Sequence, residues 1–125
     1  MPNRQVWTLR LKGWDQTMQL NDVKTALLTV TNNLRHYDAT GLIAPFVVWS
    51  EDAGGDTVHA DGKMQEQAIQ GTIDLYTRTE YDSKFSQIQT ALNNAGISFY
   101  LGSIQYEEDT KYIHYQWIFS IPMEV

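Results

Sequence analysis

Residues 112 to 120 alternate between large apolar and polar side chains, and this pattern constrains the fold more than any other feature. The apolar residues recur at every second position: Ile113, Tyr115, Trp117, Phe119 and, just beyond, Ile121. Successive side chains of a β-strand point to opposite faces, so a period of two predicts a strand with one buried face. Such a strand needs hydrogen-bonded neighbours, so the chain must contain a sheet packed on one side against a core.

Three earlier segments also predict strands. Residues 68 to 77 alternate in the same way, with Ile69, Gly71, Ile73 and Leu75 on one face. Residues 46 to 50 are β-branched and aromatic without alternation, which is typical of a strand buried on both faces, and Pro45 sets its start.

The strand predicted over residues 97 to 106 changes phase at Gly102. Ile97, Phe99 and Leu101 point inward before the glycine, and Ile104 and Tyr106 take over after it. A glycine at a phase change predicts a bulge. A short turn at residues 107 to 110 joins this strand to the last one, which predicts an antiparallel hairpin.

Two segments predict amphipathic helices. Residues 21 to 34 carry one apolar stripe, with Asn21 or Asp22 as the cap. Residues 82 to 95 carry a second stripe, with Asp82 as the cap and Gly96 closing the helix in the left-handed conformation. The two stripes are, in order: Leu20, Val23, Leu27, Val30, Leu34; and Phe85, Ile88, Leu92, Ala95.

Two segments remain. Residues 5 to 12 alternate, with Trp7, Leu9 and Leu11 on one face, which predicts a short additional strand. Because Met18 could serve as an alternative start, this strand is treated as optional. Residues 51 to 66 contain glycine and aspartate turn pairs and little pattern, which predicts a long loop of the functional or mobile kind.

The order of elements, (β)αββαββ, predicts an α+β fold. We expect a two-layer sandwich in which two helices cover one face of a mainly antiparallel, four- to five-stranded sheet. We expect residues 1–17 to form an N-terminal extension, either a strand or an arm. The length of 125 residues predicts one α+β domain, which we place at residues 18–125.

Composition excludes several classes of function. The chain has no cysteine, which rules out disulfides, thiol catalysis and cysteine-based metal sites. The net charge of -6 disfavours bulk attraction to nucleic acid or to an anionic membrane. No nucleophile elbow, phosphate-binding loop or dinucleotide fingerprint occurs, so we expect no enzyme and no cofactor.

The histidines and the acidic segments do not form a recognisable metal site. His36, His59 and His114 are not spaced as a helical ligand pair, and His114 is expected to be an exposed, cross-strand-paired residue. Asp52, Asp56 and Asp61 lack the spacing of a calcium loop, and residues 107 to 109 are interpreted first as a solvated turn.

The sequence resembles a family of small proteins from the head–tail joining region of siphophages and prophages of Gram-positive bacteria, the tail terminator or tail completion proteins. The resemblance covers residues 18 to 120. Four runs carry it: FVVWSED at residues 46–52, VHADGKMQEQAIQGTIDLYT at 58–77, SIQYEEDT at 103–110 and YIHYQW at 112–117.

The resemblance implies a structural virion protein without catalysis or cofactor. Such subunits form a hexameric ring that caps the tail tube in the virion after assembly in the host cytoplasm. The implied partners are further copies of the chain, the tail tube protein and the head–tail connector protein, with no specific nucleic-acid or membrane binding. Relatives begin near Met18, so residues 1 to 17 are a departure from the family pattern.

We expect residues 51 to 66 and the turn at 107 to 111 to contact neighbouring subunits or the tail tube. The candidate contact residues are Trp49, Asp56, His59, Lys63, Met64, Glu107, Glu108 and Asp109. Two alternatives stay open. The chain could be a head-completion or connector adaptor protein, or, in a different class, a small α+β domain that binds a metal or another ligand.

Overall fold

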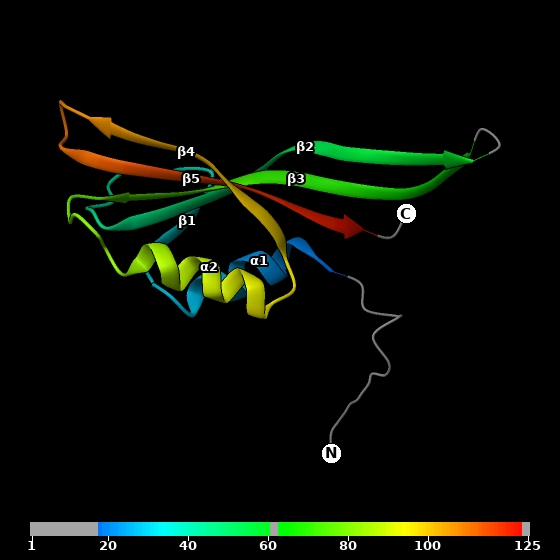
Figure 1. Ribbon diagram of the computed structural model, residues 1–125, viewed down its shortest axis with the longest axis horizontal. Helices are drawn as coiled ribbons and strands as arrows, with labels where there is room; N and C mark the ends of the chain where they lie inside the picture. The colour runs from blue at the N-terminus through cyan, green and yellow to red at the C-terminus, as the bar shows by residue number, and fades with distance from the viewer. Residues whose placement is uncertain (1–17, 61–62, 124–125) are drawn as a thin grey trace, which may run out of the picture.

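The computed structural model describes residues 18–60 and 63–123, which form a twisted five-stranded sheet with two helices on one of its faces (Figure 1). The strand predicted over residues 5 to 12 lies outside the described residues. The elements are, in chain order: α1 (Leu20–Leu28), β1 (Leu34–His36), β2 (Phe46–Ala60), β3 (Lys63–Thr77), α2 (Lys84–Asn94), β4 (Ser98–Glu107) and β5 (Tyr112–Met123).

The sheet has the strand order β1-β2-β3-β5-β4. β1 runs parallel to β2, and the other three neighbouring pairs are antiparallel. The predicted α+β class, with two helices over one face of a mainly antiparallel sheet, is therefore confirmed. β1 was not predicted, because a strand of three residues is too short to show a period.

The core lies between the two helices and the sheet. The alternating residues of β5 supply its largest side chains: Trp117, Phe119 and Ile121 are fully buried. Gly71 of β3 has no side chain, and the ring of Phe119 occupies the space above it. The other members of the core come from α1, β2, β3 and α2, with Ile97 just before β4: Val23, Ala26, Leu27, Val47, Trp49, Ile73, Leu75, Ile88, Leu92 and Ile97.

The prediction of a loop over residues 51 to 66 is wrong. β2 continues to Ala60 and β3 begins at Lys63, so the segment forms the two arms of a long β-hairpin. The register shifts three times along the hairpin: between Glu51 and Ala53, between Gly54 and Thr57, and between Val58 and His59. Pairing of backbone groups needs no apolar side chains, which is why the glycine-rich and acidic sequence gave no strand signal.

The first helix is shorter than predicted, and its beginning differs too. It begins after Gln19, and Asp22 acts one turn inside the helix, where its carboxylate accepts the Gln19 N–H at 2.8 Å. It ends at Leu28, and the Thr29 hydroxyl donates to the Ala26 carbonyl at 2.6 Å. Threonine and asparagine side chains compete with helical hydrogen bonds in this way. Leu34 still packs against the core, but from β1.

The second helix lies within its predicted range, but it begins after Ser83, so Ser83 and not the predicted Asp82 is the N-cap. Asp82 accepts the Lys84 N–H at 2.9 Å, and Gly96 has φ +74°, the left-handed conformation expected after a helix. The predicted bulge at Gly102 is also present, since the register with β5 shifts between Leu101 and Ser103.

Candidate interaction surfaces

The two segments predicted to make contacts lie at opposite ends of the molecule. The hairpin of β2 and β3 projects at one end of the long axis, and the turn between β4 and β5 lies at the other (Figure 1). In the hairpin, His59 pairs with Met64, and Lys63 pairs with Ala60. Asp56 lies in β2. The structure thus brings these backbones together, while the side chains of residues 53–67 lie outside the described part.

The β4–β5 turn carries the acidic candidates. Glu108 and Asp109 are exposed, and Lys111 closes the turn with φ +65°. Glu107 differs from them, because its carboxylate lies 3.7 Å from Nδ1 of His114 and its side chain is 39% exposed. This turn therefore presents negative charge to solvent at two of the three predicted positions.

Only 4% of the surface of Trp49 is exposed, so the prediction that Trp49 is a contact residue is wrong. It is a core residue. The His36 ring stacks between Trp49 and Tyr37, at centroid distances of 3.9 and 4.0 Å. Glu51 bridges the group: one carboxylate oxygen lies 2.7 Å from Nε2 of His36, and the other accepts the Tyr37 hydroxyl at 2.6 Å. Tyr37 has φ +74°, a backbone conformation that costs energy for a residue with a side chain.

This arrangement shifts two pKa values. Burial alone would raise the pKa of Glu51, but the hydrogen bonds from Tyr37 and His36 outweigh it and hold the pKa below its usual value of 4.5. The same hydrogen bond to Glu51 raises the pKa of the Tyr37 hydroxyl. Glu51 is therefore a carboxylate held in its charged form at the edge of the sheet.

The face of the sheet opposite the helices carries a second polar cluster. Asp74 of β3 accepts hydrogen bonds across the strands from His114, at 2.7 Å, and from Gln116, at 2.9 Å. Tyr76 stacks on the His114 ring at 4.1 Å. Burial and the nearby charges of Asp74 and Glu107 raise the pKa of the Tyr76 hydroxyl. Cross-strand pairing of His114 is confirmed, but the residue is only 13% exposed.

Aromatic side chains extend this cluster along the open face. Phe46 and Tyr76 stack at 4.9 Å, and Tyr112 meets both rings edge-on. The Arg78 guanidinium lies 4.6 Å above the Tyr112 ring, and its Nε donates to the Thr110 carbonyl at 2.9 Å. These contacts explain how Phe46 is buried on a face without helices, as predicted for this strand. Within the described residues, no three His, Asp or Glu side chains gather in a way that could hold a metal ion.

An apolar patch lies on β4. Ile104 and Tyr106 are 57% and 59% exposed, and Leu101 is 37% exposed. Ile104 pairs with Tyr115, so the phase change at Gly102 does direct it to the helix face, where it borders a hollow together with Phe85 and Tyr81. Near the turn between them, β4 and β5 extend past α2 (Figure 1), and the exposed fractions show that these three side chains are partly or largely uncovered. We call Leu101, Ile104 and Tyr106 the β4 patch.

Several stretches of strand edge are unpaired in the part of the chain that the structure describes, and the outer side of the terminal strand β1 is one of them. β4 pairs with β5 on one side, and no described strand pairs with its other side. On the far side of the sheet, β1 pairs with β2 only as far as Trp49, so β2 is open after Ser50. Unpaired edges expose backbone donors and acceptors that another strand can bind. No alternation in the sequence alone could have revealed which strands lie at the edges.

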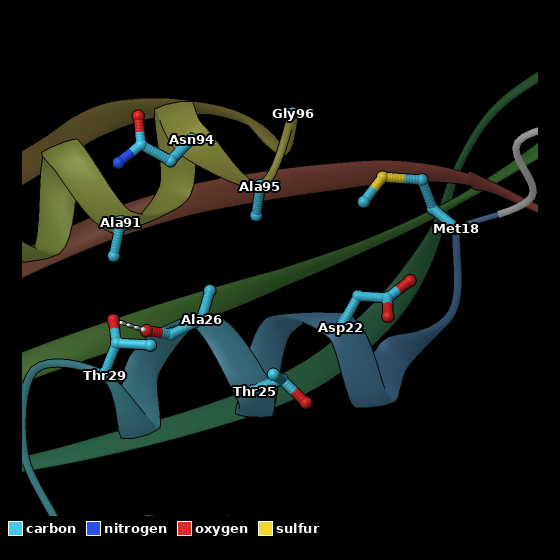
Figure 2. Close-up of a pocket in the computed structure, with 9 residues that line it drawn as sticks. All are labelled: Met18, Asp22, Thr25, Ala26, Thr29, Ala91, Asn94, Ala95 and Gly96. Atoms are coloured by element: carbon cyan, nitrogen blue, oxygen red, sulfur yellow. Dashed lines mark hydrogen bonds between the residues drawn. The ribbon is translucent and has the colours of Figure 1, made fainter. Parts of the chain in front are cut away.

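A groove of about 880 Å³ separates α1 and α2 on the helix side (Figure 2). Its walls are made largely of small side chains, and Met18 lies at one end, where α1 begins and α2 ends. It was not predicted from the sequence. The lining residues are: Met18, Asp22, Thr25, Ala26, Thr29, Ala91, Asn94, Ala95 and Gly96.

The sequence matches no protein-family model, and no curated protein is significantly similar to it. Of the helices that the structure describes, none is long and apolar enough to cross a membrane.

Proposed function

We propose that this chain is a structural subunit of a phage or prophage tail, a tail terminator that forms a ring at the end of the tail tube and joins it to the head connector. The resemblance of residues 18 to 120 to that family motivates the proposal. The α+β fold agrees with the architecture that the resemblance implies.

The observation that carries the proposal is the pair of different open edges on opposite sides of one sheet. Among the described residues, β4 has no partner on one side of the sheet, and on the other side β1 has no outer partner and β2 has no β1 partner beyond Trp49. A contact between two different surfaces of the same subunit is heterologous, and repeated heterologous contacts close into rings when the rotation allows it. The β4 patch lies beside one of these edges, and exposed large apolar side chains are typical of interface centres.

Charge supports the same function. The net charge of -6 disfavours tight binding to the phosphate backbone, which suits a ring through which DNA must move. The acidic β4–β5 turn and the projecting β2–β3 hairpin lie at opposite ends of the long axis (Figure 1). In a ring, these ends offer two distinct surfaces, one for the tail tube and one for the connector.

Light scattering coupled to size exclusion, followed by assembly on purified tail tubes of the encoding phage, tests the proposal. We expect either a particle of six times 14.4 kDa or a monomer that becomes bound at tube ends, where electron microscopy shows a ring. A chain that forms no ring and leaves tube ends bare contradicts the proposal. Binding to the connector alone would favour a head-completion protein instead.

A further inference from the structure

We propose that the groove between α1 and α2 is the docking site for the N-terminal segment of the same chain, with the apolar face formed by Trp7, Leu9 and Leu11 seated between the two helices. This inference concerns the single subunit and goes beyond the proposed role in the tail.

The groove has the size and the lining of a binding site. Its volume of about 880 Å³ falls within the range of roughly 300–1,000 Å³ that is usual for pockets that bind ligands. Ala26 on α1 faces Ala91 and Ala95 on α2, so the helices place methyl groups where larger side chains would fill the space (Figure 2). Packed interiors rarely leave such space between two helices. A groove of this kind accepts large side chains from outside it.

The position of Met18 selects the occupant. Met18 lines the groove, at the end where α1 begins and α2 ends, so residues 1–17 join the described chain at the mouth of the groove (Figure 2). No other terminus adjoins it in the part of the chain that the structure describes: the far end, at Met123, belongs to β5. An occupant that is already tethered at the mouth binds with a high effective concentration.

The lengths agree. α1 has nine residues, so the groove beside it is about 13 Å long at 1.5 Å per residue. Residues 7–11 span about 13 Å in an extended conformation. Residues 12–17 provide a reach of about 20 Å, enough to run back over the helices, and Gly13 supplies the freedom needed to reverse direction.

The charges are complementary. Asp22 is the one ionisable side chain among the residues that line the groove, and the positive end of the α1 dipole and the negative end of the α2 dipole meet at its mouth. Neither α1 nor α2 has a basic residue in its last turn. The segment supplies Arg4, Arg10 and Lys12, which alternate with its apolar residues. With the apolar face seated, these cations lie on the outer side, at the rim of the groove.

Cross-linking of the full chain tests the proposal directly, because the sequence contains no cysteine. The test variant carries Leu9→Cys and Thr25→Cys, and Thr25 is an exposed residue of the groove wall. The control carries Leu9→Cys and Tyr100→Cys, since Tyr100 is 61% exposed and lies on β4, away from the groove. Both variants are treated with a short bismaleimide at low protein concentration and analysed by intact mass.

We expect the test variant to give a bridged monomer in at least about fivefold higher yield than the control. Adding Trp7→Ser and Leu11→Ser to the test variant should reduce that yield to the control level. Equal yields in test and control overturn the proposal. Bridged dimers in place of monomers also overturn it, because they place the segment in the groove of a second copy. Because cross-linking is measured on the monomer, a negative result contradicts the docking of the N-terminal segment without bearing on whether the chain forms a ring.

Discussion

The imidazole of His114 and the carboxylate of Asp74 lie 2.7 Å apart on the open face of the sheet, in adjacent strands but not directly opposite each other. Asp74 pairs in register with Gln116, and His114 pairs with Tyr76, so the contact is diagonal. Each of the two side chains is 13% exposed. Water therefore screens this pair less than it screens an ordinary surface ion pair, and the contact ties β3 to β5 from the side that no helix covers.

A double-mutant cycle with Asp74→Ala and His114→Ala measures this contact. We expect a coupling energy of about 1–2 kcal/mol, as for a hydrogen bond to a charged group that is largely shielded from solvent. Urea unfolding at pH 7 provides the four free energies. In a control cycle, Asp74→Ala and Ser98→Ala should be additive within about 0.5 kcal/mol. The same small coupling in both cycles would contradict the expectation.

Gly71→Ala should be far more destabilising than Gly96→Ala. A methyl group at residue 71 would overlap the Ser50 carbonyl oxygen and lie 2.6 Å from the Phe119 ring, so backbone and core must both shift. We expect a loss of about 3 kcal/mol or more, the upper range of overpacking. At residue 96 a methyl group meets no atom within 4 Å, and the left-handed φ costs about 1–2 kcal/mol. Thermal and urea unfolding rank the two variants, and an inverted order would contradict the packing described for Phe119.

Glu51 should make the stability of the chain depend on acid pH. Its folded-state pKa lies below 4.5, so its contribution is fully present above pH 4.5 and is lost as the pH falls through the folded value. We expect wild type to exceed Glu51→Gln in unfolding free energy at pH 6, and the difference to shrink below pH 4.5. Tyr37→Phe removes one hydrogen bond to the carboxylate and should reduce the pH-dependent part. Unfolding curves of wild type and Glu51→Gln that stay parallel from pH 6 to pH 3 would count against this account.

Ile104→Lys should impair assembly without affecting the fold. Ile104 is 57% exposed, so the unfolding free energy should change by no more than about 0.5 kcal/mol. In the ring, a lysine would place a charge in the β4 patch, and we expect about tenfold weaker association, equivalent to 1.4 kcal/mol. Leu28→Lys, on a residue that is 42% exposed at the end of α1, is the matched control. Light scattering and tube-end occupancy compare the two, and equal effects would remove the β4 patch from the interface.

Periodicity was sufficient to predict the elements whose side chains face a core. The alternation of β5, the stripe of α2 and the bulge at Gly102 all follow from which residues must be buried. The same reasoning extended α1 too far, because Val30 and Leu34 do pack on the core but from non-helical backbone. The apolar pattern correctly predicted that Val30 and Leu34 face the core, but it could not predict that their backbone is not helical.

Features that depend on register were out of reach. The Asp74–His114 contact joins residues that are 40 positions apart, and it exists only because β3 and β5 are neighbours with one particular pairing. The extended β2–β3 hairpin and the open edges follow from backbone pairing alone. The inter-helix groove results from small residues on two distant helices, and neither helix reveals it by itself.

The neighbouring position of β3 and β5 also determines how the chain must fold. The β2–β3 and β4–β5 pairs are local in sequence and form early, because short loops close at little entropic cost. Pairing of β3 with β5 joins segments separated by all of α2 and β4, so we expect it to form the rate-limiting barrier. During synthesis β3 emerges well before β5. The nascent chain can therefore pair β1, β2 and β3, but β3 lacks its second neighbour and the core lacks Trp117 until β5 has left the ribosome.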